Sequence, residues 1–374
     1  MRKLLTFLFL LLSCFTFAQH NNHHVHQRAI EFPDIPSYHT MICDFHIHTV
    51  FSDGSVWPNI RIQEALRDSV DAVSMTEHLE YQPHRADIAH PDRNRSYEVA
   101  EQAARPYDLI VVNGAEITRS LPPGHSNAIF IKDANKLMIE DSVEVFREAN
   151  RQGAFTFWNH PNWIAQQRDG IAKLTPMHRY LIKEGLLHGI EVINDVTYSE
   201  EALQIALDHD LTIMATSDIH GLVDWQYNIP EGGHRPVTLV FTKEKTADGI
   251  KEGLMNRRTV GWFNNTLVGR EDVLLPLIDA CLTVVKTQYQ GISAVLDLTI
   301  ENNSDVEFIL ANQSDYSFHA NTDIVIIHPN TTTTLQVKTL EQVKDLSLKF
   351  KVLNAVSAPK THPDIVIPIQ IFDE

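Results

Sequence analysis

The sequence predicts an α/β barrel of seven or eight repeats, followed by a smaller all-β domain. Between residues 41 and about 262, short apolar runs alternate with amphipathic stretches of helical spacing. Such alternation is expected of a parallel sheet covered by helices. After about residue 270 the chain instead alternates apolar with polar residues, with Asn, Ser, Asp and Pro at the breaks. That pattern is typical of a β-sandwich. We therefore expect a barrel at 41–265 and a sandwich-like domain at 270–374.

The elements of the barrel follow from these two periods. The apolar runs expected to form strands are 41–46, 72–75, 109–116, 126–131, 154–158, 189–193, 211–216 and 237–242. The stretches expected to form helices are 58–69, 96–104, 141–153, 199–210 and 246–258. In the third helix, Asp141 and Ser142 are candidate N-caps and Gly153 is a candidate stop.

The first residues have the layout of a secretory signal peptide, with a basic start, an apolar run and a small residue at Ala18. A cleavage site between Ala18 and Gln19, at the end of the signal segment 1–19, predicts an exported, periplasmic or extracellular protein. A lipoprotein signal with Cys14 lipidated is the minor alternative, and a membrane anchor is disfavoured because the apolar run is short. Residues 20–40 are expected to be a flexible leader, although their histidines could bind metal.

The composition limits the class of partner. The formal net charge is −17, and loss of Arg2 and Lys3 with the signal peptide would take it to about −19. A general nucleic-acid binder needs a basic surface, so that class is disfavoured. Beyond the signal peptide only Cys43 and Cys281 remain. They are too few for a disulfide scaffold, although they could pair in an oxidising compartment.

Nine potential metal ligands fall where the predicted strands end. They are His46, His48, Asp53, His78, Glu116, His125, His160, Asp218 and His220. All except His125 lie at or just after the carboxyl end of a strand, the face on which α/β barrels carry their active sites. One histidine at such a place is more often a packing group. Burying six imidazoles and three carboxylates together without a cation would cost many kcal/mol in desolvation, so the set predicts a metal centre.

The segments "DFHIHTVFSDG", "TEH", "GAEIT", "GHSNAIF", "NHP" and "SDIH" occur in the order found in the polymerase and histidinol phosphatase (PHP) superfamily. The chain resembles that superfamily over residues 41–262. The resemblance implies a distorted (β/α)7 barrel that holds two or three divalent metals and hydrolyses phosphate esters.

The resemblance also implies how the ligands are shared among the ions. The first ion would bind His46, His48, Glu116 and Asp218. The second would share Glu116 as a bridge with His125 and His160. The third would take Asp53, His78 and His220. Many members of the superfamily have a histidine where this sequence has Asp53, so occupancy of the third site turns on that residue.

Mixed imidazole and carboxylate ligands suit Mn²⁺, Zn²⁺ or Fe²⁺ better than Ca²⁺ or Mg²⁺. Three such ions with three carboxylates would leave a charge of about +3, which attracts anions to an otherwise acidic protein. Divalent ions a few ångströms apart can hold a bridging hydroxide and clamp a phosphoryl group for attack.

Other residues are candidates for contacts with the substrate. Arg119 and Arg235 are expected to bind the phosphoryl group, and His234 to protonate the leaving alkoxide. Surface solvation is the alternative for both arginines. Asp44 and Glu77 neighbour ligands and are expected to accept hydrogen bonds around them. A further set of side chains, which could form an apolar wall or pack in the core, comprises Trp158, Trp163 and Trp225.

The exported leader, the "PPGHSNAIF" context and the β-rich C-terminal domain resemble secreted phosphodiesterases of the superfamily that cleave small organic phosphate diesters. The leading hypothesis is therefore an exported metal-dependent phosphodiesterase acting on a small anionic ester. The first alternative is a histidinol-phosphatase-like phosphomonoesterase on the same metal centre. The alternative of another class is a non-catalytic metal-binding protein.

Overall fold

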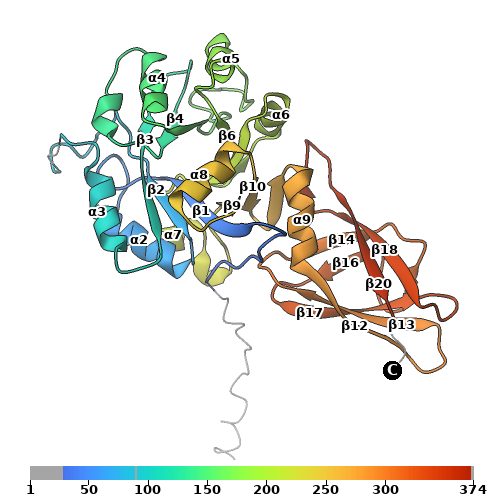
Figure 1. Ribbon diagram of the computed structural model, residues 1–374. Helices are drawn as coiled ribbons and strands as arrows, with labels where there is room; N and C mark the ends of the chain where they lie inside the picture. The colour runs from blue at the N-terminus through green and yellow to red at the C-terminus, as the bar shows by residue number, and fades with distance from the viewer. Residues whose placement is uncertain (1–27, 89–90, 372–374) are drawn as a thin grey trace, which may run out of the picture.

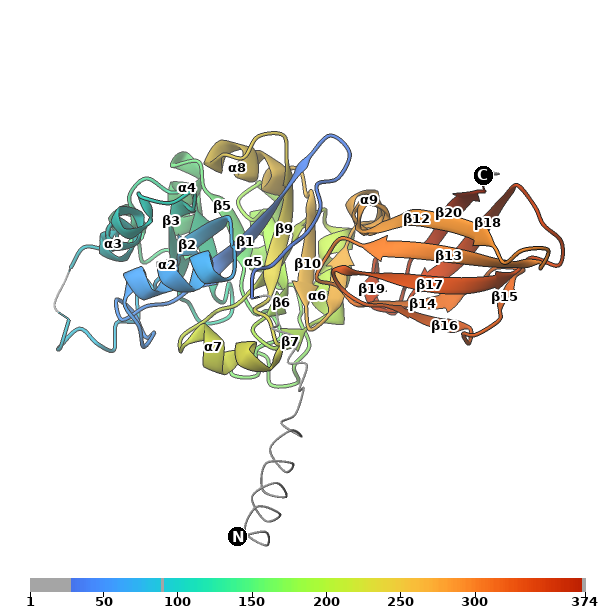
Figure 2. The same cartoon turned by 90° about the horizontal axis from the view of Figure 1, so that it is seen from below.

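The computed structural model describes residues 28–88 and 91–371. They form a barrel-like α/β unit and an all-β unit that lie side by side and meet at helix α9 (Glu271–Cys281), as Figures 1 and 2 show. The predicted signal peptide, Cys14 and residues 20–27 of the predicted leader lie outside the described residues. Among the residues described, no helix has the length and apolarity that spanning a bilayer requires.

Each predicted strand of the α/β unit is present, with ends shifted by at most two residues. The strands are β1 (His39–Ile47), β2 (Ala72–Met75), β3 (Ile110–Ile117), β4 (Ser126–Ile129), β5 (Phe155–Trp158), β6 (Gly189–Asn194), β7 (Thr197–Tyr198), β8 (Thr212–Thr216), β9 (Val237–Thr242), β10 (Thr259–Phe263) and β11 (Thr266–Gly269). Strands β1 to β6 and β8 to β10 are almost wholly buried. This burial explains why they read as unbroken apolar runs.

The sheet is mixed rather than wholly parallel. Strands β1, β2 and β3 are parallel, as are β5, β6 and β8. Strand β4 runs antiparallel to both β3 and β5, and β9, β10 and β11 continue antiparallel from β1. The expectation of a parallel sheet therefore fails at β4 and at β9 to β11. Strands β3 and β4, and likewise β10 and β11, are joined by loops without a helix, as antiparallel neighbours can be.

Helices cover the outside of the sheet. They are α2 (Pro58–Arg67), α3 (Arg95–Ala104), α4 (Glu144–Arg151), α5 (Pro176–Lys183), α6 (Glu200–Asp208), α7 (Val223–Gln226) and α8 (Ala247–Met255), with short 3₁₀ turns η1 (Ala134–Leu137) and η2 (Ile229–Glu231). The five predicted helices are all present. Before α4, Asp141 accepts hydrogen bonds from the backbone N–H groups of Val143 and Glu144 (2.9 and 2.8 Å), as its predicted capping role requires.

Side chains close the barrel where the backbone ladder does not. Thr238 of β9 donates its hydroxyl to the carbonyl of Ala215 (2.7 Å) and accepts the Ala215 N–H (2.9 Å). Thr259 of β10 donates to the carbonyl of Ile213 (2.8 Å). Gly261 permits the approach, since a Cβ at this position would lie 2.9 Å from the Cβ of Ala215. Strand β8 is thus held against β9 and β10 by threonine hydroxyls, which accounts for the distortion of the barrel.

The segment before β1 is packed against the α/β unit. Ile30 and Ile35 are buried in the main hydrophobic core. Arg28 pairs with Asp68 (2.8 Å) and Asp224 (2.6 Å). The prediction of a flexible leader is therefore wrong for residues 28–40. Ile30 and Ile35 are isolated apolar residues, and two such residues form no periodic pattern from which their burial could be predicted.

The C-terminal unit begins with α9, a helix that the sequence pattern did not predict. Two four-stranded antiparallel sheets follow, in the orders β12-β13-β17-β15 and β16-β14-β18-β20. Their bounds are β12 (Leu282–Tyr289), β13 (Val295–Asn302), β14 (Phe308–Asn312), β15 (Ser317–Phe318), β16 (Ile324–Ile327), β17 (Thr331–Lys338), β18 (Asp345–Val352) and β20 (Asp364–Gln370). Every second residue of β13 and β18 is buried, as expected of two sheets that share one core.

The two units are joined by more than a linker. Strand β19 (Ala355–Val356) leaves the sandwich and pairs in parallel with β11, so it extends the barrel sheet. Just before it, the amide of Asn354 donates to the carbonyls of Asn265 (2.7 Å) and Glu307 (2.9 Å). One continuous hydrophobic cluster includes residues of both units, among them Trp262, Leu277 and Leu348.

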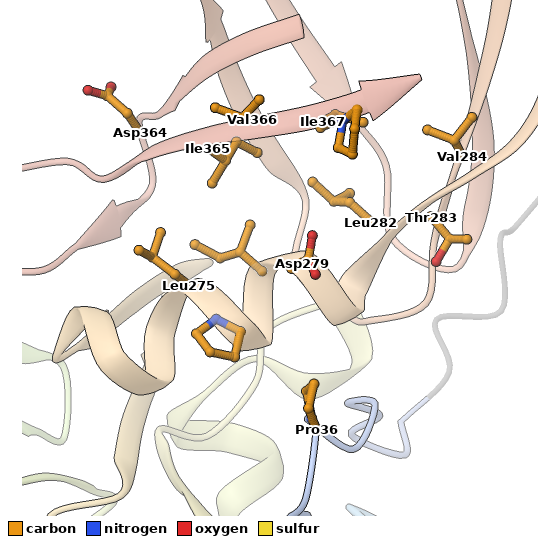
Figure 3. Close-up of a pocket in the computed structure, with 13 residues that line it drawn as sticks. Pro36, Leu275, Asp279, Leu282, Thr283, Val284, Asp364, Ile365, Val366 and Ile367 are labelled. Carbon is orange, nitrogen blue, oxygen red and sulfur yellow. The ribbon is translucent and has the colours of Figure 1, made fainter. Parts of the chain in front are cut away.

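A groove of about 630 Å³ lies between α9, β12 and β20 (Figure 3). Its lining is mainly aliphatic, with Asp279 and Asp364 also present. None of the nine predicted metal ligands lines this groove, so it is separate from the predicted site. Cys43 and Cys281 are buried and unpaired.

Candidate metal centre

The fold brings the nine predicted ligands together at one rim of the barrel. His46 lies in β1 and Glu116 in β3, and the others follow or precede strands by a few residues. Residues His78 and Glu116 form a parallel bridge just beyond the ladder of β2 and β3. His125 precedes β4, and because β4 runs antiparallel to β3, its start lies at the rim where β3 ends. This reversal explains the one ligand that did not follow a strand.

The first group has the spacing of ligands around a single ion. The Nε2 atoms of His46 and His48 lie 3.1 Å apart, and each lies 3.1 Å from Asp218 Oδ1. Glu116 completes the group, with oxygens 3.7 Å from His46 Nε2 and 3.6 Å from His48 Nε2. Ligand atoms about 2.0–2.2 Å from one ion lie about 3–3.5 Å from one another. The group therefore fits a divalent transition ion.

The second group gathers on the other side of Glu116. Its Oε1 lies 3.0 Å from His125 Nδ1 and 3.5 Å from His160 Nε2. Asn159 donates its amide to the same oxygen (2.8 Å). Glu116 is thus placed between the first and second groups, as the predicted bridging role requires.

The third group is centred on Asp53. One carboxylate oxygen lies 3.2 Å from His78 Nε2 and the other 3.2 Å from His220 Nε2. His48 also lies within reach of this group, and His78 Nδ1 lies 2.5 Å from Glu116 Oε2. The three groups therefore overlap, and their division among separate ions stays a prediction.

Hydrogen bonds fix the imidazole tautomers of four histidines. Each directs Nδ1 to a hydrogen-bond acceptor: His46 to Glu191 (2.7 Å), His48 to Ser52 (3.2 Å), His78 to Thr118 (2.7 Å) and Glu116 Oε2 (2.5 Å), and His220 to the carbonyl of Asp218 (2.7 Å). Glu191 and the Asp218 carbonyl can only accept. Ser52 donates its own proton to Glu77, and Thr118 donates to the Glu116 carbonyl (3.2 Å). Each Nδ1 therefore carries a proton, so Nε2 is the nitrogen that would bind an ion once it is deprotonated.

The electrostatics of the site favour cations. Burial raises the pKa of Glu116, but His78 and hydrogen bonds from other histidines outweigh burial and hold it well below its ordinary value. For Asp53, burial is likewise outweighed by His220 and His78, and its pKa is lowered. Burial lowers the pKa of His78, yet Glu116 and Asp53 raise it to about 11. In addition, Glu116 Oε2 and Asp218 Oδ1 are buried without a well-aligned hydrogen bond. Bound ions would satisfy both atoms.

Two ligand positions have unusual backbone geometry. His160 and Asp218 adopt positive φ values of 28° and 49°, a region that side chains with a Cβ rarely occupy. Glu191 accepts the His160 N–H (2.6 Å), and Asn194 donates to Asp218 Oδ2 (3.3 Å). The surrounding hydrogen bonds thus hold both ligands in conformations that turn them toward the centre.

Comparisons with known proteins agree with this geometry. A two-domain protein from Bacteroides vulgatus, described as containing a predicted PHP-like metal-dependent phosphoesterase, is 40% identical, with a TM-score of 0.85. The match covers 94% of this chain and all of that one. The chain belongs to this PHP-like family of metal-dependent phosphoesterases.

A family model described as an Ig-like domain (DUF5001) matches residues 282–368 of this phosphoesterase. More distant matches include a proposed metal-dependent phosphoesterase from Bifidobacterium adolescentis (17% identity, 48% of this chain and 87% of that one, TM-score 0.38). The lesion-specific endonuclease EndoQ from Pyrococcus furiosus also matches (12% identity, 78% and 70%, TM-score 0.38). A search of curated proteins gave no significant match.

The sequence analysis missed Glu191, which hydrogen-bonds to two candidate ligands of the phosphoesterase centre. This buried carboxylate in β6 accepts hydrogen bonds from His46, the His160 backbone, Thr216 and Asn194. It thereby fixes a ligand of the first group and one of the second. A charged residue inside the apolar run "GIEVIN" was the signal that could have identified it, because an unpaired carboxylate there would be costly.

Arg61 was also missed. Its guanidinium is buried and donates to the carbonyls of His48 (2.9 Å), Ile219 (3.1 Å) and Gly221 (2.6 Å). It therefore ties the chain after β1 to the chain after β8, the two segments that carry His48 and His220. The sequence offered no signal for this role, since arginine is common on exposed helix faces.

The two carboxylates expected to support ligands have different roles. Glu77 accepts the hydroxyls of Thr49 (2.5 Å) and Ser52, and Ser52 in turn contacts His48. Asp44 accepts the N–H (3.1 Å) and the hydroxyl (2.5 Å) of Ser217, the residue before Asp218. Glu77 thus acts on a ligand side chain, and Asp44 on the backbone that carries one.

The structure corrects the expected role of Arg235. Its side chain is only 1% exposed and pairs with Asp44 (3.1 Å) and Asp68 (3.6 Å). A guanidinium so enclosed cannot reach a phosphoryl group. Its charge instead balances two buried carboxylates.

Arg119 does not point freely into the site either. Its guanidinium pairs with Glu80 (2.9 Å) and donates to the carbonyls of Ile139 and Glu140. These partners satisfy most of its donors, so the expected phosphoryl contact is not formed by this conformation. The loop after β3 brings Arg119 to the carbonyls of residues 139 and 140. This contact between segments about 20 residues apart could not be predicted from the spacing along the sequence.

His234 is not arranged as a general acid. Its Nδ1 donates to the Arg235 carbonyl (3.0 Å), its Nε2 accepts the Asn265 N–H (3.2 Å), and its ring stacks on Trp262 with centroids 3.4 Å apart. Burial lowers the pKa of His234 to about 4. The imidazole is neutral and fully engaged, so the expected proton transfer is ruled out in this arrangement.

Replacement of Glu191 tests its supporting role. Glu191→Gln is expected to weaken metal binding by about 10- to 100-fold, because the amide cannot accept from all its present donors. Isothermal titration with Mn²⁺ or Zn²⁺ measures the change, and the exposed Glu244→Gln is the matched control. Affinity equal to that of the parent protein would show that Glu191 does not position the ligands.

Metal content distinguishes the three groups. Glu116→Gln is expected to remove two ions per chain, because its carboxylate lies between the first and second groups. Asp53→Asn is expected to remove one at most. Elemental analysis by mass spectrometry counts the ions. Equal losses in the two variants would contradict the placement of Glu116 as the bridge.

Metal uptake is expected to release protons at pH 7. The pKa of His78 is raised to about 11, so its imidazole is doubly protonated at pH 7 in the metal-free protein. An imidazole that binds a metal must be neutral. Affinity should therefore fall as the pH is lowered. Calorimetric titrations in two buffers of different ionisation enthalpy measure the released protons. A binding enthalpy independent of the buffer would contradict this expectation.

Proposed function

We propose that this chain is an exported phosphodiesterase that hydrolyses small organic phosphate diesters with two or three divalent ions, Mn²⁺, Zn²⁺ or Fe²⁺. One observation carries the proposal: imidazole and carboxylate ligands form three overlapping groups, two of which share the buried carboxylate of Glu116. Ligand groups that share a residue place their ions a few ångströms apart, the spacing of two-metal phosphoesterase sites.

Bound ions would supply the nucleophile, by acidifying water, and the positive charge that stabilises the phosphoryl group in the transition state. The chain's own residues provide the fixed geometry. Glu191, Ser52 and Thr118 orient the imidazoles, and Arg61 holds the ends of β1 and β8 together. Such preorganisation spares the site from reorganising during the reaction.

Charge supports a diester over a monoester. A phosphomonoester carries close to two negative charges at neutral pH, and a diester carries one. Arg119 and Arg235, which were expected to bind the phosphoryl group, are instead paired with Glu80, Asp44 and Asp68. The phosphoryl group would then rely on the ions alone, which suits the monoanion of a diester.

Export is part of the proposal and rests on residues 1–19. Their basic start, apolar run and Ala18 are the features of a cleavable signal. A small substrate is proposed because the formal net charge of −17 disfavours extended contact with a polyanion.

The proposal is tested with a matched pair of chromogenic substrates. Bis(4-nitrophenyl) phosphate is expected to be hydrolysed at least about tenfold more efficiently (kcat/KM) than 4-nitrophenyl phosphate, and a chelator is expected to abolish turnover. Glu116→Gln, purified in parallel, controls for contaminating phosphatases.

Each other outcome selects a different function. Turnover of the monoester alone would identify a phosphomonoesterase. Stoichiometric metal uptake without turnover of either ester would instead support a metal-binding protein and refute the enzyme.

A further inference from the structure

Two exposed aromatic side chains lie directly beside the metal centre. Among the described residues, the exposed large aromatic side chains are Trp57, Tyr81, Tyr107, Trp163, Tyr180 and Trp225. Of these, Tyr81 and Trp163 have ring contacts with candidate ligands. The Tyr81 ring meets His78 edge-on at a centroid distance of 5.8 Å. The Trp163 ring lies 5.5 Å from His125 and 5.2 Å from His160.

The two rings lie at the two ends of a chain of ring contacts that runs through the ligand imidazoles. Tyr81 contacts His78, His78 contacts His125 (5.6 Å), and His125 contacts Trp163. Only these two imidazoles therefore separate the two rings along the chain of contacts. Both imidazoles border Glu116, where the ligand groups overlap. Both rings thus contact imidazoles that would surround a phosphoryl group bound at the centre.

The backbone places both rings in the same manner. Each aromatic residue follows a ligand by three positions: Tyr81 follows His78, and Trp163 follows His160. In each case the chain folds back on the carbonyl of the ligand. The Trp163 N–H donates to the His160 carbonyl (2.9 Å), and Gln82, beside Tyr81, donates its side chain to the His78 carbonyl (2.6 Å). These hydrogen bonds hold the segments that carry the two rings close to the ligands.

The rings of Tyr81 and Trp163 are not core residues. Trp158, also considered for an apolar wall, is 1% exposed and stacks on His178 at 3.9 Å, as a core residue does. Tyr81 and Trp163 are 52% and 44% exposed. Exposed aromatic faces at a binding site gain from contact with planar groups, which stack on them. Trp225, 79% exposed, has no such ring contact with a ligand and is a matched control.

We propose that Tyr81 and Trp163 form an aromatic clamp that binds a planar aromatic substituent of the phosphate ester. The clamp selects esters by the group attached to phosphorus through oxygen, while the metal centre binds the phosphoryl oxygens. This inference rests on the proposed function, since it names the substrate class of the same site. It differs from that function in predicting discrimination between substituents that carry the same charge.

Competitive inhibition by phosphonates that differ only in their substituent tests the clamp. Phenylphosphonate is expected to inhibit hydrolysis of bis(4-nitrophenyl) phosphate about 3- to 10-fold more strongly than cyclohexylphosphonate or methylphosphonate. Trp163→Ala and Tyr81→Ala are each expected to reduce that preference by several fold. Trp163→Phe and Tyr81→Phe are expected to retain most of it, and Trp225→Ala all of it.

Metal content, measured on every variant, separates binding from support of the histidines. Loss of the phenyl preference with unchanged metal content supports the clamp. An unchanged preference in both alanine variants would overturn it, as would an equal weakening of all three phosphonates. If the parent protein hydrolyses neither ester, the proposed function fails. The same phosphonate ratios, measured by calorimetry on the metal-loaded protein, then still decide whether the clamp exists.

Discussion

Glu116 is a fully buried carboxylate, and the arrangement of the site depends on satisfying its charge. Imidazole nitrogens from His78, His125 and His160 and the amide of Asn159 all lie within 3.5 Å of its two oxygens. A carboxylate taken out of water without cations would be prohibitively unstable. The ends of three strands, β2, β4 and β5, therefore converge on it. Bound metal ions would supply the positive charge that this carboxylate needs.

Around this charge, a second set of buried groups keeps the strand ends in register. Arg61 links the carbonyl of His48 to those of Ile219 and Gly221. Arg235 pairs with Asp44, and Asp44 accepts from Ser217, next to the ligand Asp218. His234, adjacent to Arg235, accepts the Asn265 N–H from the turn between β10 and β11. Arg235, which was expected at the substrate, thus stabilises the scaffold, because buried carboxylates outside the ligand set also need partners.

The sequence was sufficient for eight strands and five helices of the α/β unit, and it named nine candidate ligands that the fold brings together, because each depends on a local period or on a residue type at a strand end. It was insufficient where the outcome depends on which segments meet. The direction of β4, the packing of residues 28–38 and the partner of Arg119 are all long-range properties. Glu191 lies between these cases. Its position in an apolar run was visible, but the four donors that justify it come from β1, β8 and the segments around 160 and 194.

Strand β19 bears on how this chain unfolds. The sandwich contributes that strand to the edge of the barrel sheet, and the two units share one hydrophobic cluster. Neither unit is then a module in the usual sense. Removal of the sandwich would uncover an unpaired β11 edge, the kind of edge that recruits other chains and leads to aggregation. Denaturation should accordingly be a single cooperative transition, and the Ig-like domain is part of the stability of the metal centre rather than an appendage to it.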